Sequence, residues 1–250
     1  MRRLILVILS VLFAINFGFA QEEVVEEVVS KELKAAPEGV TAESVIKKYV
    51  EAIGGEKKML KVKSITTYAH TTIQGADLMF TFHYKDPGKY FMEMGTVDMT
   101  LQKQVCDGTK AKIVAMGNEK EVTGAELEAL KYEASINKEL RYAELGVKLE
   151  LLGIDNINGV EAYALKMTIP GGAEQFEYFD INSGLRIRTM TFIEMPEGKF
   201  ENILDMGDYK PVKGVKFPFS MTQSVGGQVI ELTVSSYLLN KVDDAVFVMK

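Results

Sequence analysis

Apolar and polar residues alternate along much of the chain between Ser64 and Tyr237. In the segment 76–85, for example, Leu78, Phe80 and Phe82 are separated by single residues. A period of two places successive side chains on opposite faces of a β-strand. We therefore predict a succession of short amphipathic strands, each with one apolar and one polar face.

Short turn signals separate these strands. The pairs Asp107-Gly108, Asn158-Gly159, Ser183-Gly184 and Gly226-Gly227 each lie between two apolar stretches. Two-residue loops of this kind are typical of β-hairpins. Because such loops are short, neighbouring strands must run antiparallel.

In two stretches the apolar residues recur with the period of a helix instead of a period of two. Thr41 is a suitable N-cap for the first helix, and Gly54-Gly55 is a suitable stop. The first helix has an apolar stripe formed by Val45, Ile46, Tyr49, Val50 and Ile53. Thr123 and Glu126 form a T-x-x-E capping box that predicts a second helix extending to about Glu139.

The number of strands predicts the architecture. Five strands are expected before the second helix and about seven after it, and twist makes so large a sheet curl or close. We predict a mainly β protein with helices (α+β), an incomplete antiparallel β-barrel of about 11–12 strands covered by short α-helices. The covered concave side is where we expect a ligand to lie.

The N-terminal residues have the composition of a secretion signal. Arg2 and Arg3 precede an apolar run at 4–19, and Gly18 and Ala20 occupy the small-residue positions of a signal-peptidase site. The alternative is a membrane anchor, but the run is shorter than the ~20 residues that span a bilayer. We predict cleavage after Ala20 and a periplasmic protein.

The remaining sequence divides into two parts. Residues 21–40 form an acidic segment that we interpret as a linker, and residues 41–250 form a single ligand-binding domain. Loss of Arg2 and Arg3 takes the formal charge from -6 to -8, which argues against nucleic acid or an anionic membrane surface as a partner. With Cys106 as the single cysteine, no intramolecular disulfide forms.

The sequence offers little catalytic chemistry. It contains no G-x-S-x-G, H-E-x-x-H, H-x-x-E-H or phosphate-binding glycine loop. If Gly75-Ala76 forms a two-residue turn, His70 pairs with Thr81 and approaches His83, but a metal site would need a third ligand. Alternation places Cys106 on the polar side of its strand, where a nucleophilic role is weakly supported. We therefore predict a protein that is not an enzyme and has no cofactor or metal.

Methionine is the less ordinary feature of the apolar faces. Ten of the 13 methionines lie between Ser64 and Tyr237. Methionine is unbranched and adaptable, which suits a ligand-binding wall, but it is also a common filler of irregular cores. We predict that a hydrophobic ligand would contact Leu78, Phe80, Phe82, Tyr90, Met92, Met94, Met99, Leu101, Leu165, Met167, Met190, Phe192, Phe217 and Phe219.

Four segments carry a resemblance to a known family. They are TAESVIKKYVEAIGGEKKMLKVKSI at 41–65, NGVEAYALKM at 158–167, FDINSGLRIR at 179–188 and YKPVKGVKFPFSM at 209–221. With them the chain resembles a diverged member of the periplasmic outer-membrane lipoprotein carrier superfamily, the LolA-like proteins, from Thr41 to Lys250. The resemblance implies an incomplete barrel, closed by helices, whose cavity shields acyl chains from water.

The chain departs from this family at one position. The resemblance implies an arginine on an early strand that helps to latch the lid, yet there is no arginine between Arg3 and Arg141. Lys63 is the nearest substitute. The resemblance also extends to domains attached to zinc peptidases, an activity that the missing H-x-x-E-H motif excludes here.

These observations lead to three hypotheses. The first is a monomeric periplasmic carrier of lipids or lipoprotein acyl chains, involved in outer-membrane lipoprotein sorting or envelope maintenance. The second is a non-catalytic envelope protein-interaction module with a filled core, whose polar face or acidic N-terminal segment contacts a protein partner. The third is a small hydrolase that uses Cys106 or a histidine.

Overall fold

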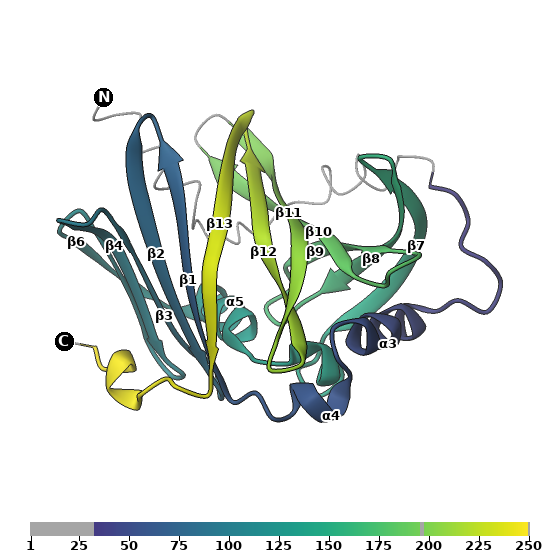
Figure 1. The fold of residues 1–250 in the computed structure, drawn as a ribbon, viewed down its shortest axis with the longest axis horizontal. Helices are drawn as coiled ribbons and strands as arrows, with labels where there is room; N and C mark the ends of the chain where they lie inside the picture. Colours follow the sequence, from purple (N-terminus) through teal and green to yellow (C-terminus); the bar gives the residue numbers. More distant parts are fainter. Residues whose placement is uncertain (1–32, 196–197, 250) are drawn as a thin grey trace.

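The protein is built on one antiparallel sheet of 13 strands. The computed structural model describes residues 33–195 and 198–249, so the predicted signal peptide and most of the predicted linker lie outside the described residues. In the sheet, the strands follow the order β6-β5-β4-β3-β2-β1-β13-β12-β11-β10-β9-β8-β7 (Figure 1). No described strand joins β6 to β7, so the sheet stays open, which confirms the predicted incomplete barrel.

The strands are joined mainly by short turns. Their bounds are β1 Ser64–Ile73, β2 Ala76–Lys85, β3 Lys89–Gly95, β4 Thr100–Asp107, β5 Ala111–Ala115, β6 Asn118–Val122, β7 Lys148–Ile157, β8 Val160–Thr168, β9 Glu174–Asp180, β10 Arg186–Met195, β11 Gly198–Val212, β12 Val215–Val225 and β13 Gln228–Leu239. The described helices are α3 Ala42–Ala52, α4 Glu56–Met59, α5 Gly124–Ala134 and the 3-10 turns η2 Lys138–Leu140 and η3 Asp244–Phe247.

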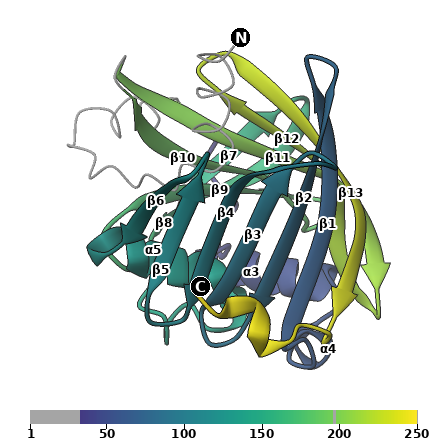
Figure 2. The ribbon, with the colours of Figure 1, turned by 90° about the vertical axis from the view of Figure 1, so that its left-hand side faces the viewer.

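The sheet curves around its helices. Figures 1 and 2 show α3 and α5 on the inner side of the curve, between the two halves of the sheet. Two hydrophobic clusters fill that side. One lies under α3 and includes Leu165 and Met167; we call it the inner cluster of α3. The other lies under α5 and includes Phe80 and Met92; we call it the inner cluster of α5. Tyr84 packs against both, so the apolar lining is continuous from one half of the sheet to the other.

Helix α3 begins as the sequence predicts. The Thr41 hydroxyl accepts a hydrogen bond from the Ser44 backbone N–H at 3.2 Å, and the Ser44 hydroxyl accepts one from the Thr41 N–H at 3.0 Å. These bonds satisfy backbone donors that the first turn of a helix leaves free. At the other end, Ile53 accepts a hydrogen bond from the Lys216 N–H at 2.7 Å, which fixes the helix to the β11–β12 turn.

Helix α5 differs from its prediction at both ends. Thr123 makes no side-chain capping bond, and Glu126 instead forms an ion pair with Lys120 of β6 at 2.9 Å. The helix ends at Ala134 rather than near Glu139, because Ser135 is extended and Asn137 is left-handed. The capping box prediction was wrong: Gly124, directly after Thr123, has a φ of +60°, and Glu126 pairs with Lys120 instead.

The sheet contains one more strand than the predicted range. β6 was missed because four of its five residues, from Asn118 to Glu121, are polar and exposed. It lies at the edge of the sheet and needs no apolar face to be stable there. Six strands therefore precede α5, where the sequence pattern indicated five.

Among the described residues, no helix has both the length and the apolar composition needed to cross a membrane. The longest, α3 and α5, have 11 residues each and pack against the sheet.

Gly54 provides a test of how α3 docks. Its φ is +134°, and a Cβ there would collide with the Gly214 carbonyl oxygen. We expect Gly54→Ala to lower the free energy of unfolding by about 2–4 kcal/mol in urea denaturation, through backbone strain and steric overlap. Gly207→Ala is the control, since a Cβ there meets nothing within 4 Å and no positive φ is required. Equal denaturation midpoints for the two variants would contradict this docking.

Candidate functional site

The inner faces of β2 and β3 form the first part of the candidate site. All six predicted residues on these strands are buried in the inner cluster of α5: Leu78, Phe80, Phe82, Tyr90, Met92 and Met94. The Phe80 and Phe82 rings stack with their centroids 6.2 Å apart. Leu130 of α5 packs on the same cluster and is 1% exposed. This half of the wall is thus filled by its own side chains and by α5.

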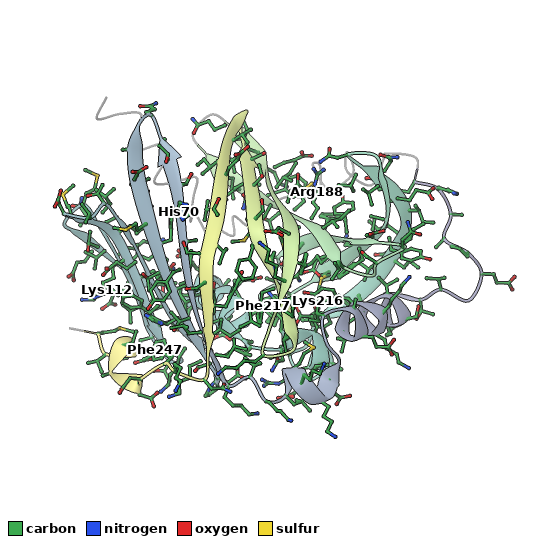
Figure 3. The ribbon with its side chains drawn as sticks, in the orientation of Figure 1. His70, Lys112, Arg188, Lys216, Phe217 and Phe247 are labelled. Atoms are coloured by element: carbon green, nitrogen blue, oxygen red, sulfur yellow. The ribbon has the colours of Figure 1, made fainter. Side chains whose placement is uncertain are left out.

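The second part lies on β8 and β12. Leu165 and Met167 are fully buried beneath α3, and Phe217 packs against the same cluster. Phe217 also stacks on Tyr237 of β13 at 4.7 Å between centroids, near the base of the sheet in Figure 3. Phe219 makes an edge contact with the same ring at 5.3 Å. These residues connect the two halves of the inner face.

Two predicted wall residues lie on the opposite face. Leu165 is paired with Glu177, whereas Met190 is paired with Phe176. Since successive residues of β9 point to opposite faces, Met190 projects away from Leu165. Met190 and Phe192 pack instead in a separate cluster with Phe176. Their prediction as inner-wall residues was wrong because β8 to β10 carry apolar side chains on both faces.

β4 presents the face opposite to the predicted one. A register shift follows Met94, so that Gln102 and Gln104 are paired with Met94 and Met92 and lie on their face. Val105 packs on the outer side with Phe247, which is labelled in Figure 3. The alternation of β4 was therefore assigned to the wrong face.

The two predicted wall residues near the start of β4 have different surroundings. Met99 lies outside the strand and is 58% exposed, so its prediction as a wall residue was wrong. Leu101 is half-buried and packs against the inner cluster of α5.

Cys106 also follows the reversed face of β4. It is fully buried, and its Sγ donates to the Gly88 carbonyl oxygen at 3.4 Å. The prediction of a polar position was wrong. Burial raises the pKa of the thiol, which disfavours the thiolate that a nucleophile requires.

The two histidines are held apart by a turn that differs from the prediction. The turn is Gln74-Gly75, both with positive φ, so His70 is paired with Met79 and His83 with Thr66. His83 Nδ1 lies 2.8 Å from the Thr66 hydroxyl, and burial lowers its pKa. The described residues contain no group of three side chains suited to a metal ion.

A buried ionic cluster lies between α3, η2 and the sheet, and sequence reasoning missed it. The Arg186 guanidinium donates to Glu177 Oε1 at 2.8 Å and lies 3.6 Å from Glu139 Oε1. It also covers the Tyr49 ring of α3 at 5.3 Å. The Tyr209 hydroxyl donates to the Arg186 carbonyl oxygen at 2.8 Å. We call Arg186, Glu177, Glu139, Tyr49 and Tyr209 the Arg186 cluster.

The electrostatics of the Arg186 cluster follow from its burial. The Glu177 side chain is fully buried, and this desolvation raises its pKa, partly opposed by Arg186. Burial disfavours the charge on Arg186, but Glu177 and its other neighbours hold the pKa of the guanidinium well above its ordinary value. The cluster thus attaches α3 and η2 to the inner face through one shared cation.

The sequence contains only a weak signal for this cluster. Glu177 lies in the alternating segment EQFEYFD at 174–180. From the sequence alone, the strand face that carries Glu177 looks like an ordinary solvent-exposed face. Arg186 stands at the start of an ordinary amphipathic strand. Only the pairing of β9 with β8 shows that the face of Glu177 is the covered one.

Comparisons with known proteins identify the fold. A scan against family models and a search of curated proteins find no match. Among solved structures, a LolA superfamily protein from Nitrosomonas europaea is similar with a TM-score of 0.54 and 13% identity, covering 84% of this chain and 99% of that one. A DUF1329 family protein from Desulfovibrio piger has a TM-score of 0.54 and 12% identity, covering 82% and 96%. The chain has a diverged LolA-like fold.

Proposed function

We propose that the protein is an exported carrier that binds acyl chains of lipids or lipoproteins against the inner face of its open sheet. The observation that carries this proposal is the continuous apolar lining that runs under both helices and meets at Tyr84. A lining of this kind offers a linear apolar ligand a path through both halves of the sheet. The LolA-like fold supports the proposal at the level of architecture only.

The described arrangement corresponds to a closed state of such a site. Phe80, Met92 and Met94 are at most 1% exposed, so a ligand must displace side chains or α5. Burial of each CH₂ contributes about 0.8 kcal/mol, so a 14-carbon chain gains on the order of 10 kcal/mol before these displacements are subtracted. Methionine side chains can adopt new rotamers around such a chain, which reduces the displacement cost.

Helix α5 is the element best placed to move. It covers the β2–β4 wall through Leu130 and Ala134. Its connection to η2 is held by polar contacts of three kinds. The Ile136 N–H donates to Asp86 at 3.1 Å, the Asn137 amide donates to the Met59 carbonyl oxygen at 2.8 Å, and Lys138 of η2 forms an ion pair with Glu133 of α5 at 2.6 Å. Displacement of this one helix would uncover the wall without breaking the sheet.

The Arg186 cluster restrains the other side of the site. It connects α3 and η2 to β9 and β10, which are elements far apart in the sequence. The early-strand arginine that the family resemblance implied is absent, and Arg186 supplies a helix-to-sheet contact from a later strand. We assign it a positioning role that keeps α3 and η2 over the lining.

A second candidate is the interaction module with a filled core. The observation that favours it is the same dense packing of the inner clusters, which contain side chains with almost no exposure. This candidate requires no ligand and no displacement of α5. It differs from the carrier in one measurable respect, which is the response of the protein to fatty acids.

The wild-type response to lipid tests the proposal first. The full chain, expressed in a bacterial host and purified, should carry lipid detectable by native mass spectrometry, and myristate should raise its melting temperature. A ligand at 100 times its Kd stabilises a protein by about 2.7 kcal/mol. Repeated absence of bound lipid, with no change in melting temperature, would exclude the carrier and favour the filled-core module.

A matched pair of substitutions tests the wall. Met94→Gln places an amide in the inner lining and should weaken binding of a fluorescent acyl probe by about tenfold, because the bound chain would bury that amide without a partner. Met99→Gln makes the same chemical change at an exposed position and should leave the affinity unchanged. Affinity is measured by fluorescence titration of the folded proteins. Equal affinities would place the acyl site elsewhere.

The Arg186 cluster has an expected pH dependence. Arg186→Met leaves Glu177 buried without its cation and should lower the free energy of unfolding by about 3–5 kcal/mol at pH 8. Glu177 has a folded-state pKa that burial raises, so its protonated form stabilises the fold at low pH and this contribution is lost as the pH rises through the folded pKa. The decrease in the free energy of unfolding caused by Arg186→Met should therefore be smaller at pH 5 than at pH 8, as measured by urea denaturation.

Arg188→Met is the control for this experiment. Arg188 pairs bidentately with Asp205, whose side chain is 30% exposed, so its loss should cost about 1–2 kcal/mol, less than the loss of Arg186. The Arg186→Met protein should also take up the acyl probe faster in stopped-flow fluorescence, because α3 and η2 are less restrained. An Arg186 variant that behaves like the Arg188 variant at both pH values would contradict the assigned role.

A further inference from the structure

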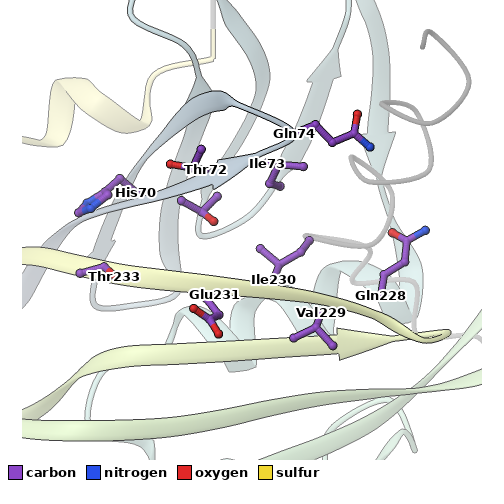
Figure 4. Close-up of a pocket in the computed structure, with 10 residues that line it drawn as sticks. His70, Thr72, Ile73, Gln74, Gln228, Val229, Ile230, Glu231 and Thr233 are labelled. Carbon is purple, nitrogen blue, oxygen red and sulfur yellow. The ribbon is translucent and has the colours of Figure 1, made fainter.

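The sheet separates locally between β1 and β13. The two strands pair from Ile65 opposite Leu239 to His70 opposite Thr233, with a register shift around Ser235. Beyond His70, the β1–β2 and β12–β13 hairpins continue apart, as Figures 1 and 4 show. Each hairpin keeps its own ladder to its turn. The result is a wedge-shaped opening in an otherwise continuous sheet, which we call the sheet split.

The backbone groups along the sheet split point into it. Val225 and Gln228 flank the two-residue turn of the β12–β13 hairpin and pair with each other. In an antiparallel ladder, successive residues direct their N–H and C=O groups alternately to the two sides. Val229 and Glu231 therefore direct theirs away from β12, toward β1. By the same alternation Thr72 directs its groups away from β2, toward β13.

These edges have no strand partner among the described residues. The ladder between β1 and β13 stops at His70, so the backbone groups of Thr72, Val229 and Glu231 are left outside it. Unpaired strand edges are templates for another strand. Here two such edges face one another across a single opening.

A pocket of about 840 Å³ occupies the sheet split (Figure 4). Ten residues line it, and the three apolar ones are Ile73, Val229 and Ile230. The other seven carry hydroxyl, amide, imidazole or carboxylate groups. A lining with this composition suits an acyl chain poorly, because its polar groups would be buried without partners. It suits a ligand that itself carries regularly spaced hydrogen-bond donors and acceptors.

We propose that the sheet split binds an extended polypeptide segment of a partner protein, which inserts as a strand between β1 and β13. An inserted strand lies about 4.8 Å from each neighbour, and the opening widens from the last pair at His70 toward the rim. The segment would complete both ladders at once. Main-chain hydrogen bonds of this kind give affinity with little dependence on sequence.

The residues on the two faces of the sheet split determine which side chains the inserted segment should carry. Ile230 is buried in the inner cluster of α5, and Ile73 packs against the same cluster. On the outer side lie Glu231 and the Thr72–Asp77 pair, whose hydroxyl and carboxylate are 2.7 Å apart. Because side chains of a strand alternate between faces, the fitting segment alternates apolar and basic residues.

A peptide of eight alternating valine and lysine residues, with blocked ends and a fluorophore, is the probe. Fluorescence anisotropy with the full chain should show saturable binding. N-methylation of either alternate set of residues should weaken binding by about tenfold or more, because each set donates to a different edge of the split. Sensitivity to one set only would indicate addition to an outer edge of the sheet and would overturn the proposal, as would absence of binding.

Two protein variants test the location. Val229→Pro removes one N–H that faces the split and leaves the residues that pair β13 with β12 intact. It should weaken binding of the peptide probe by about tenfold. Val229→Ala retains the N–H and should bind within about twofold of the wild type. Circular dichroism and the melting temperature verify that each variant is folded. Equal peptide affinity for the proline and alanine variants would place the peptide elsewhere.

The acyl experiments and the peptide experiments are separable. The wall change Met94→Gln should leave peptide affinity unchanged, and Val229→Pro should leave acyl affinity unchanged. A chain that binds the peptide but no lipid would reject the proposed carrier function and keep the strand-insertion site.

Discussion

Everything in this structure depends on covering the inner face of a sheet that does not close. A closed barrel satisfies its edge strands by pairing them, but this sheet ends at β6 and β7 and curves around its own helices. The apolar side chains of β2, β3 and β8 are withdrawn from water only because α3 and α5 lie over them. The same helices therefore stabilise the fold and cover its interior.

The periodicity of the sequence was sufficient to assign the buried face of a strand where one face is apolar and the other is polar. This holds for β2 and β3, whose inward residues from Leu78 to Met94 are placed as predicted. It failed at β4, because a register shift after Met94 exchanges the faces and alternation alone cannot reveal such a shift. It failed again at Met190 and Phe192, where both faces of the sheet are apolar.

The candidate site was predicted less completely than the fold. Its apolar part follows from alternation, but the Arg186 cluster does not, since Arg186 and Glu177 stand on strands that look ordinarily amphipathic. Their burial depends on the order of the strands and on the position of η2, which are properties of the whole chain. The separation of β1 from β13 is likewise invisible in either strand alone.

β6, the strand that the sequence pattern did not predict, disfavours association of the open sheet with other chains. β6 is an edge strand whose residues Asn118 to Glu121 are exposed and mostly charged, and Lys112 and Glu119 form an ion pair across its hairpin. Burying such charges between two stacked sheet edges is unfavourable. At the other edge, Lys34 forms a bridge with Ile154 of β7. Both ends of this open sheet are thereby made poor templates for the addition of further strands, which disfavours aggregation through the edges.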